Sequence, residues 1–166
     1  MFRSKEEIYT DWYLNELMDK GYVSKFEYEA YTFTLTEPVV KIITEVKQLK
    51  NSTKEVLKRK TLLHGCSYTP DFRIEFIKIP DCLINNLFIT DNIWWIDVKG
   101  SFNGLHNTSA ATFPLASKFL YDKHNILVQK FVPGIEFAKT FTPERFLSTD
   151  KETKERKIKW EIKKLM

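Results

Sequence analysis

Hydrophobic and polar residues alternate with a period of two in the middle of the chain, which is typical of half-buried β-strands. In residues 71–79, apolar side chains fall on one face and charged side chains on the other. In residues 93–99, large apolar side chains alternate with Trp95, Asp97 and Lys99. Asp97 and Lys99 are therefore expected to leave the same face of a strand whose other face is buried.

A longer period indicates helices on either side of these strands. Residues 4–20 are predicted to form a helix, with Ser4 as the N-cap, Glu7 as its capping-box partner and Gly21 as the C-terminal stop. Residues 110–124 read as a second helix, and residues 126–132 as a short buried strand. A strand, a helix and a strand in succession predict two parallel neighbouring strands.

The segment between the first helix and residue 70 is rich in β-branched and aromatic residues. Residues 22–35 read as strand, and residues 36–63 as an inserted β-hairpin that turns at residues 51–53. One face of this hairpin is expected to be basic, formed by Lys54, Lys58, Arg59 and Lys60. The predicted fold is α/β, with a central mixed β-sheet flanked by helices and this hairpin inserted.

Length and composition narrow the class of protein only modestly. The 166 residues predict a single domain, 1–166, and 43% hydrophobic residues are enough for a real core. No apolar run approaches the length of a membrane span, and the first residues show no signal-peptide pattern, which predicts a cytoplasmic protein. The net charge of +4, with a basic tail at residues 150–166, permits a polyanionic partner without requiring one.

Three acidic residues and one lysine stand out as candidate chemistry. Burying a carboxylate or an ammonium group is costly unless the group is paired or binds a metal, so Asp97 and Lys99 form a candidate site. Asp71 begins the preceding strand, and Glu7 lies on the inward side of the first helix. Carboxylates converging at strand ends suit Mg²⁺, and a nearby lysine can stabilise charge that develops on a phosphate. These are the groups that phosphodiester hydrolysis needs.

The same residues resemble the PD-(D/E)XK nuclease superfamily. Pro70-Asp71 matches the first half of its signature, and Asp97-Val98-Lys99, followed by Gly100, matches the second half. The nearest likeness is to the phage endonuclease I type, which resolves Holliday junctions; the shared stretches are 68–72, 26–29 and 99–100. Asp97 stands where that type has glutamate, and the inserted hairpin is a departure from it.

This resemblance implies a restriction-endonuclease-like core and a specific set of roles. It implies Asp71, Asp97 and the Val98 carbonyl as metal ligands, Lys99 as the catalytic lysine and Glu7 as a supporting acid. The implied activity is Mg²⁺-dependent cleavage of DNA, with Mn²⁺ able to substitute, by a phage-encoded enzyme in the host cytoplasm that acts on branched DNA. A homodimer is also compatible, because two nearby cuts require two sites.

Several alternatives remain open from the sequence. Asp97 and Lys99 would also suit a structural ion pair, and Glu7 a helix cap, with Glu6 as the other helix carboxylate. The chain would also suit a catalytically silent nucleic-acid-binding domain, or the cutting subunit of a larger recombination complex, and DNA and RNA are not distinguished. Backbone phosphates are expected to contact the four hairpin residues Lys54, Lys58, Arg59 and Lys60, together with Lys118 and the tail, although these residues would also suit an ordinary solvated surface. His106 reads as a surface loop residue, with a phosphate contact as its alternative.

Overall fold

The computed structural model describes residues 2–50, 52–100, 108–148 and 155–165, which form two compact units. Unit 1 comprises Met1–Tyr31 and Thr69–Met166, and unit 2 comprises the intervening Thr32–Tyr68. The predicted hairpin insertion therefore lies within a compact unit of its own. No helix of the described residues is long and apolar enough to cross a membrane.

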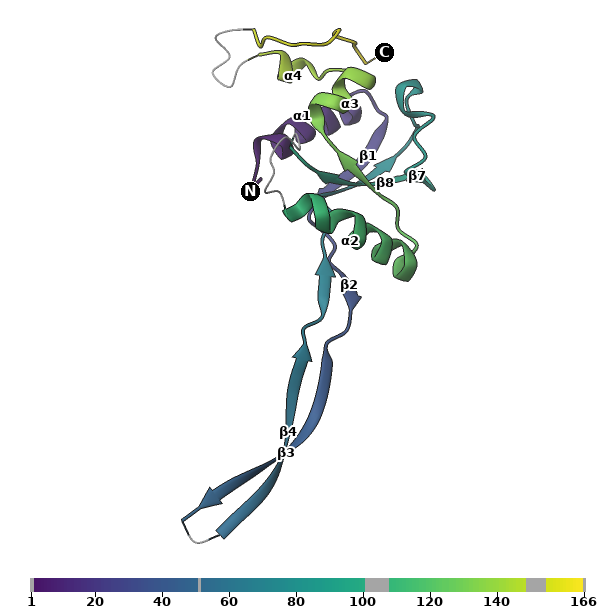
Figure 1. Cartoon of the computed structure of the whole chain (residues 1–166). Helices are drawn as coiled ribbons and strands as arrows, with labels where there is room; N and C mark the ends of the chain where they lie inside the picture. The colour runs from purple at the N-terminus through teal and green to yellow at the C-terminus, as the bar shows by residue number, and fades with distance from the viewer. Residues whose placement is uncertain (1, 51, 101–107, 149–154, 166) are drawn as a thin grey trace. The chain divides into compact units, whose positions relative to one another are not determined.

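Unit 1 is built on a five-stranded mixed sheet (Figure 1). Strands β1, β6, β8 and β7 are neighbours in that order and antiparallel, and β9 pairs with β8 in parallel. The prediction of an α/β fold with a central mixed sheet is thereby confirmed, as is the parallel pair joined by a helix. The strands are β1 (Val23–Tyr28), β6 (Phe72–Phe76), β7 (Ile89–Thr90), β8 (Ile93–Val98) and β9 (Val128–Phe131).

Helices lie on both sides of this sheet. In Figure 1, α1, α3 and α4 lie on one side and α2 lies on the other. Pro133 occupies the first turn of α3, where its missing N–H is tolerated. The bounds are α1 (Lys5–Asp19), the 3₁₀ helix η1 (Asp81–Leu83), α2 (Thr108–His124), α3 (Pro133–Lys139) and α4 (Glu144–Leu147).

The core lies between α1 and the apolar face of β6 and β8. Phe72, Ile74 and Ile96 are fully buried, as the alternation in the sequence predicts, and they join a cluster with residues of α1. Tyr13 of α1 stacks on Phe137 at 5.5 Å between ring centroids. This packing fixes α1, and hence the acidic residues of its first turn, against the sheet.

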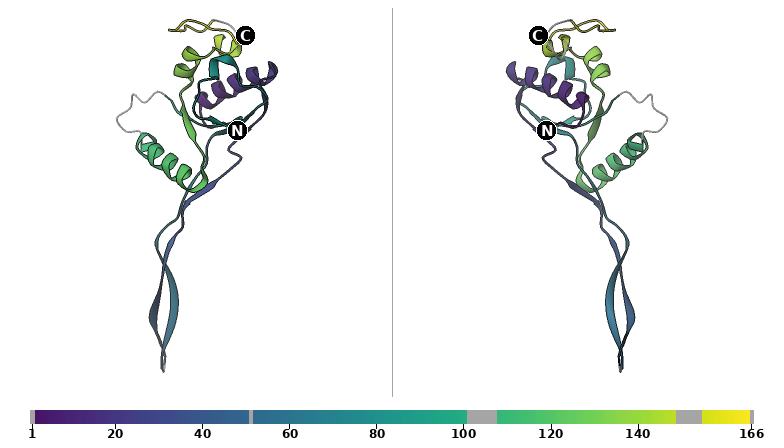
Figure 2. Two further views of the ribbon diagram at one scale, coloured as in Figure 1. Left: turned by 90° about the vertical axis from the view of Figure 1, so that its right-hand side faces the viewer. Right: turned by 90° about the vertical axis from the view of Figure 1, so that its left-hand side faces the viewer.

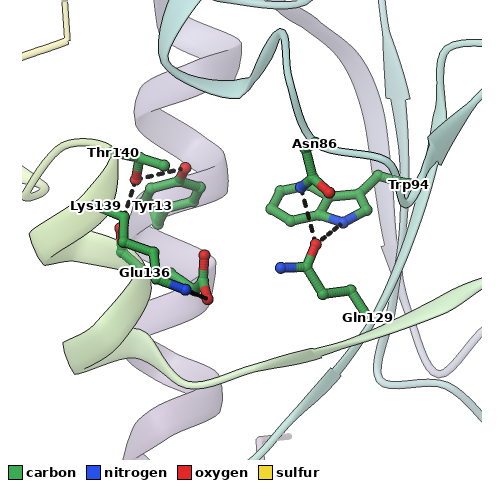
Figure 3. Close-up of polar contacts among 7 residues, drawn as sticks. All are labelled: Tyr13, Asn86, Trp94, Gln129, Glu136, Lys139 and Thr140. Carbon is green, nitrogen blue, oxygen red and sulfur yellow. Dashed lines mark hydrogen bonds and ion pairs between the residues drawn. The ribbon is translucent and has the colours of Figure 1, made fainter.

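Two polar groups within the core are satisfied by local hydrogen bonds, drawn in Figure 3. The buried Tyr13 hydroxyl donates to Thr140 Oγ1 at 3.1 Å, which ties α1 to the end of α3. The indole Nε1 of Trp94 and the amide of Asn86 both donate to Gln129 Oε1, at 2.9 and 2.8 Å. Since buried polar groups are costly when unpaired, these contacts define how α3 and β9 meet the rest of unit 1.

The described part of the basic tail, residues 155–165, packs on unit 1. The guanidinium of Arg156 lies over the rings of Tyr9 and Phe146 and donates to the Phe146 carbonyl at 2.9 Å. Trp160 stacks on Phe146, and Leu165 is buried. The tail was expected to contact DNA as a whole. Arg156 instead has a structural role, because its donors and its charge are already engaged by protein.

Unit 2 contains two pairs of antiparallel strands. A short pair, β2 (Phe33–Thr36) and β5 (Cys66–Tyr68), forms its base, and a long hairpin, β3 (Val39–Leu49) and β4 (Ser52–Leu63), extends from it. Gly65 lies where the two pairs meet, and a Cβ there would approach the Thr36 carbonyl oxygen to 2.7 Å. Only glycine therefore fits this position without displacing the backbone.

The register of β3 and β4 assigns each side chain of the hairpin to one of two faces. Lys41 pairs with Lys60, Ile43 with Lys58, and Lys47 with Lys54, so all five lysines lie on one face, which we call the basic face. Arg59 pairs with Ile42 on the opposite face. The expectation that Arg59 shares a face with Lys54, Lys58 and Lys60 is therefore wrong, because neighbours along a strand point in opposite directions. Figure 2 shows the two strands twisting around each other.

Candidate functional site

The strand register brings Asp71 and Asp97 side by side. Phe72 pairs with Ile96 in the antiparallel ladder of β6 and β8, so one step further along places Asp71 opposite Asp97. The backbone N–H of Val98 donates to Asp71 Oδ2 at 2.6 Å, which fixes the Asp71 carboxylate at this end of the sheet. Two residues that lie 26 positions apart in the sequence therefore form one pair of carboxylates.

The electrostatic environment of Asp71 opposes its ionisation. Burial and the neighbouring charge of Asp97 raise the pKa of Asp71 to about 7, and Glu7 adds to this effect. The Val98 N–H and the charge of Lys99 act in the opposite direction but do not outweigh them. Strongly perturbed carboxyl groups of this kind cluster at functional sites, where burial and neighbouring like charges tune their pKa values.

Lys99 lies next to the second carboxylate. Its Nζ is 2.7 Å from Asp97 Oδ2, and its backbone N–H donates to the Phe131 carbonyl of β9 at 2.8 Å. Asp97 is buried and the Lys99 side chain is 21% exposed, so the ammonium group reaches solvent from the buried carboxylate. This contact agrees with the alternative that Asp97 and Lys99 form a structural ion pair. It also places a positive charge beside the two carboxylates.

Glu7 is held in place by hydrogen bonds to both carboxylate oxygens. Ser4 Oγ donates to Oε1 at 3.0 Å, while the Arg3 N–H and the Tyr28 hydroxyl donate to Oε2 at 2.7 and 2.6 Å. Burial raises the pKa of Glu7, but these donors outweigh it and lower the pKa overall. Glu7 therefore caps α1 as a carboxylate, and its charge is close enough to act on Asp71.

We expect Glu7→Gln to lower the free energy of unfolding by about 1–3 kcal/mol at pH 7, because one acceptor oxygen is replaced by an amide group that faces donors. The depressed pKa means that this stabilisation is present at neutral pH and is lost as the pH falls through the pKa of Glu7 in the folded state. Urea denaturation at pH 7 and at a series of lower pH values, continued until the difference between the two proteins disappears, measures both effects. The matched control is Glu6→Gln, one position away, which should change stability little; equal losses in the two variants would contradict the capping role.

Glu6 is the other acid in the first turn of α1, and it lies beside the end of β8. Its Oε1 is 3.5 Å from the position that a Cβ on Gly100 would occupy. Glu7 and Glu6, the two candidates for the helix carboxylate of the site, therefore have different surroundings. The Glu7 carboxylate is engaged in capping α1, and the Glu6 carboxylate lies against the segment that carries Lys99.

The predicted phosphate contacts are distributed over both units. Lys118 is exposed on α2 at a pocket of about 450 Å³ that Phe88, Tyr121 and Val128 also line. Lys54, Lys58 and Lys60 share the basic face of unit 2, and Arg59 lies on the other face. His106 and residues 150–154 of the tail lie outside the described residues.

Sequence reasoning missed two groups around the carboxylates. Tyr28 reaches Glu7 across 21 positions, and its place in a run of aromatic residues gave no indication of this contact. The guanidinium of Arg73 lies 5.6 Å from the ring centroids of both Tyr31 and Trp95, and it is paired with Glu27 and Glu75. The alternation of β6 and β8 placed Arg73 and Trp95 on the same side as Asp71 and Asp97, but it did not indicate that Arg73 lies over the two rings.

The described residues around the carboxylate pair offer few candidate ligands for a metal. Among the described residues, no group of three or more His, Cys, Asp or Glu side chains is arranged to hold a metal ion. Mg²⁺, however, is usually bound through one or two carboxylates together with water and substrate phosphate. Asp71 and Asp97 satisfy that smaller requirement.

No protein-family model, curated protein or solved structure matches this chain. Its function is therefore inferred from the carboxylate pair, Lys99 and their surroundings.

Proposed function

We propose that this chain is a Mg²⁺-dependent endonuclease that hydrolyses phosphodiester bonds in DNA. The observation that carries the proposal is the pairing of Asp71 with Asp97 at one end of β6 and β8, with Lys99 Nζ 2.7 Å from Asp97 Oδ2. Asp71 and Asp97 belong to different segments of the chain, and the register of β6 and β8 brings them together. Their agreement with the PD-(D/E)XK pattern gives the arrangement a chemical interpretation.

The two carboxylates fit a hard cation. Asp71 accepts from the Val98 N–H through Oδ2 and Asp97 pairs with Lys99 through Oδ2. The residues that would hold Mg²⁺ are Asp71, Asp97 and the carbonyl of Val98. When bound, Mg²⁺ would polarise the scissile phosphate and make an attacking water more acidic. Mn²⁺ shares this preference for oxygen ligands and should substitute.

The protein groups have separate tasks in this proposal. Asp97 holds the Lys99 ammonium group beside the carboxylate pair, where it stabilises the negative charge that develops on the phosphate. Glu7, held ionised by its three donors, adds negative charge near Asp71 and so favours a cation there. As water attacks phosphorus, one P–O bond forms, the other breaks, and the leaving alkoxide takes up a proton.

The test is cleavage of supercoiled plasmid in the presence of Mg²⁺. We expect Lys99→Ala to lower the rate of cutting by about 10²- to 10³-fold, the usual cost of removing one group that stabilises the transition state. The matched control is Lys78→Ala, an exposed lysine that follows β6, at the opposite end of that strand from Asp71. Cutting by Lys99→Ala at the wild-type rate would contradict the proposal.

A second candidate is a catalytically silent nucleic-acid-binding domain. It is favoured by the direct Lys99–Asp97 ion pair and by the lack of a three-residue metal group among the described side chains. Such a domain would bind DNA equally well with and without Mg²⁺ and would never nick it. Comparing linear duplex, single strands, a flap, a four-way junction and an RNA duplex then identifies the substrate, with branched DNA tested first because of the likeness to phage endonuclease I.

A further inference from the structure

The face of the hairpin opposite the lysines is apolar and exposed. Val40, Ile42, Val46 and Leu57 share it, with exposed fractions from 42% to 74%. Two of its remaining residues are charged, namely Arg59, opposite Ile42, and Glu55, opposite Val46. We call this surface the apolar face.

An apolar face on a two-stranded ribbon needs an explanation. In the part of the chain that the structure describes, β3 and β4 pair only with each other, and isolated two-stranded hairpins are marginally stable in water. A contiguous exposed apolar patch on a protein surface is often functional. The length of the hairpin, eleven residues in β3 and twelve in β4, exceeds what a simple connection between β2 and β5 needs.

The charges on this face have a symmetry that suggests the partner. Thr44 and Leu57 form its central pair, Ile42 and Arg59 lie two residues to one side, and Val46 and Glu55 lie two residues to the other. Two copies can be placed with their apolar faces together and related by a two-fold axis that lies between them. If this axis passes through the centre and runs perpendicular to the strands, β4 of one copy lies on β4 of the other and runs in the opposite direction. Arg59 of each copy then faces Glu55 of the other, Leu57 faces Leu57, and Ile42 faces Val46.

The other arrangement with two-fold symmetry is much poorer. An axis along the strands would lay β4 of one copy over β3 of the other, and both charges would face apolar side chains. The basic face cannot self-associate either, because its five lysines would be brought together. We therefore infer that the apolar face docks on the apolar face of a second copy of this chain, antiparallel, with Arg59–Glu55 ion pairs on both sides of a Leu57 contact.

The expected strength follows from the size of the contact. The apolar face comprises five residue pairs, from Val40–Thr61 to Gln48–Thr53, because only every second pair of the hairpin points to this side. With a rise of about 3.4 Å per residue and a width of two strands, the face covers roughly 300 Å² per copy. This is small beside the roughly 800 Å² per partner of a stable interface, so we expect a dimer that dissociates at micromolar concentrations. The inference does not depend on the proposed nuclease activity.

Charge reversal tests the inference by sedimentation equilibrium. Wild type should dimerise as its concentration rises to about 200 µM, and Arg59→Glu or Glu55→Arg should each weaken dimerisation at least tenfold, because each reversal places two pairs of like charges in contact. An equimolar mixture of the two variants should dimerise again, since all contacts between unlike copies are then attractive. This rescue also excludes misfolding as the cause of the single effects.

A control on the other face separates dimerisation from nucleic-acid binding. Lys54→Gln with Lys60→Gln should leave dimerisation unchanged, while weakening DNA binding and reducing its salt dependence. A wild-type protein that stays monomeric at all concentrations would overturn the inference. So would single variants that dimerise like wild type, or a mixture that fails to restore the dimer.

Discussion

Asp71→Asn is expected to lower Mg²⁺-dependent cleavage by at least about 10³-fold, which corresponds to about 4 kcal/mol of lost transition-state stabilisation. The substitution preserves the shape of the side chain, and the amide oxygen can still accept from the Val98 N–H. It removes the negative charge on which a shared cation depends. A plasmid-nicking time course with excess enzyme measures the loss.

The same variant is expected to be more stable than wild type at high pH. At pH 8 the wild-type Asp71 is ionised beside Asp97 and Glu7, and the neutral amide of the Asp71→Asn variant removes this repulsion. A gain of about 1–2 kcal/mol, or a few degrees in Tm, should appear at pH 8 and shrink as the pH falls from about 7 towards 4, where Asp71 becomes protonated in the unfolded chain as well. Asp71→Ala is the control, because it removes the acceptor for the Val98 N–H and should not gain. A variant that loses both activity and stability would indicate a structural role for Asp71.

Mg²⁺ affinity is expected to rise roughly 25-fold between pH 5.5 and pH 7.5. A cation must displace the proton from Asp71, whose pKa in the folded protein is about 7, so the apparent affinity falls nearly tenfold per unit below that pH. Isothermal titration in two buffers of different ionisation enthalpy should show about 0.9 proton released per Mg²⁺ at pH 6 and almost none at pH 8.5. An affinity that is constant over this range would exclude Asp71 as a ligand.

The stability of the metal-free protein has the opposite pH dependence, and the sign follows from the same group. The Asp71 pKa is higher in the folded protein than in the unfolded chain, so between about pH 4 and pH 7 the folded state holds more protons. Stability therefore decreases as the pH rises through this window. Saturating Mg²⁺ should abolish this trend, because Asp71 is then ionised in the folded protein as it is in the unfolded chain above about pH 4.

The strands and the first helix were predictable because their signals are local. The capping residues Ser4 and Glu7 fixed the start of α1, and the alternation in residues 71–79 and 93–99 separated the apolar faces of β6 and β8 from the faces that carry Arg73 and Asp97. The pairing of Asp71 with Asp97 also depends on the antiparallel register of β6 and β8, which the structure supplies. Local periodicity thus located the candidate residues, and the register brought them together.

The features that the sequence did not reveal depend on contacts between residues far apart in the chain, or on which face of a strand a side chain occupies. Nothing near Tyr28 indicates that its hydroxyl reaches Glu7, because that contact exists only once β1 lies beside α1. Arg59 was grouped with Lys58 and Lys60 because they are contiguous, although a period of two puts it on the other side. The consecutive charges obscured the alternation, and with it the apolar face of the hairpin.

The base of unit 2 has an evolutionary consequence. Phe33 and Tyr68 are paired, so the chain leaves unit 1 and returns to it across a single pair of strands. Insertions or deletions in matched pairs along β3 and β4 would change the reach, charge or partner of the hairpin, while the ladder that aligns Asp71 with Asp97 keeps its register. Selection can therefore act on the hairpin and on the carboxylate pair separately, and chains of this kind can diversify in the hairpin while the carboxylates stay where they are.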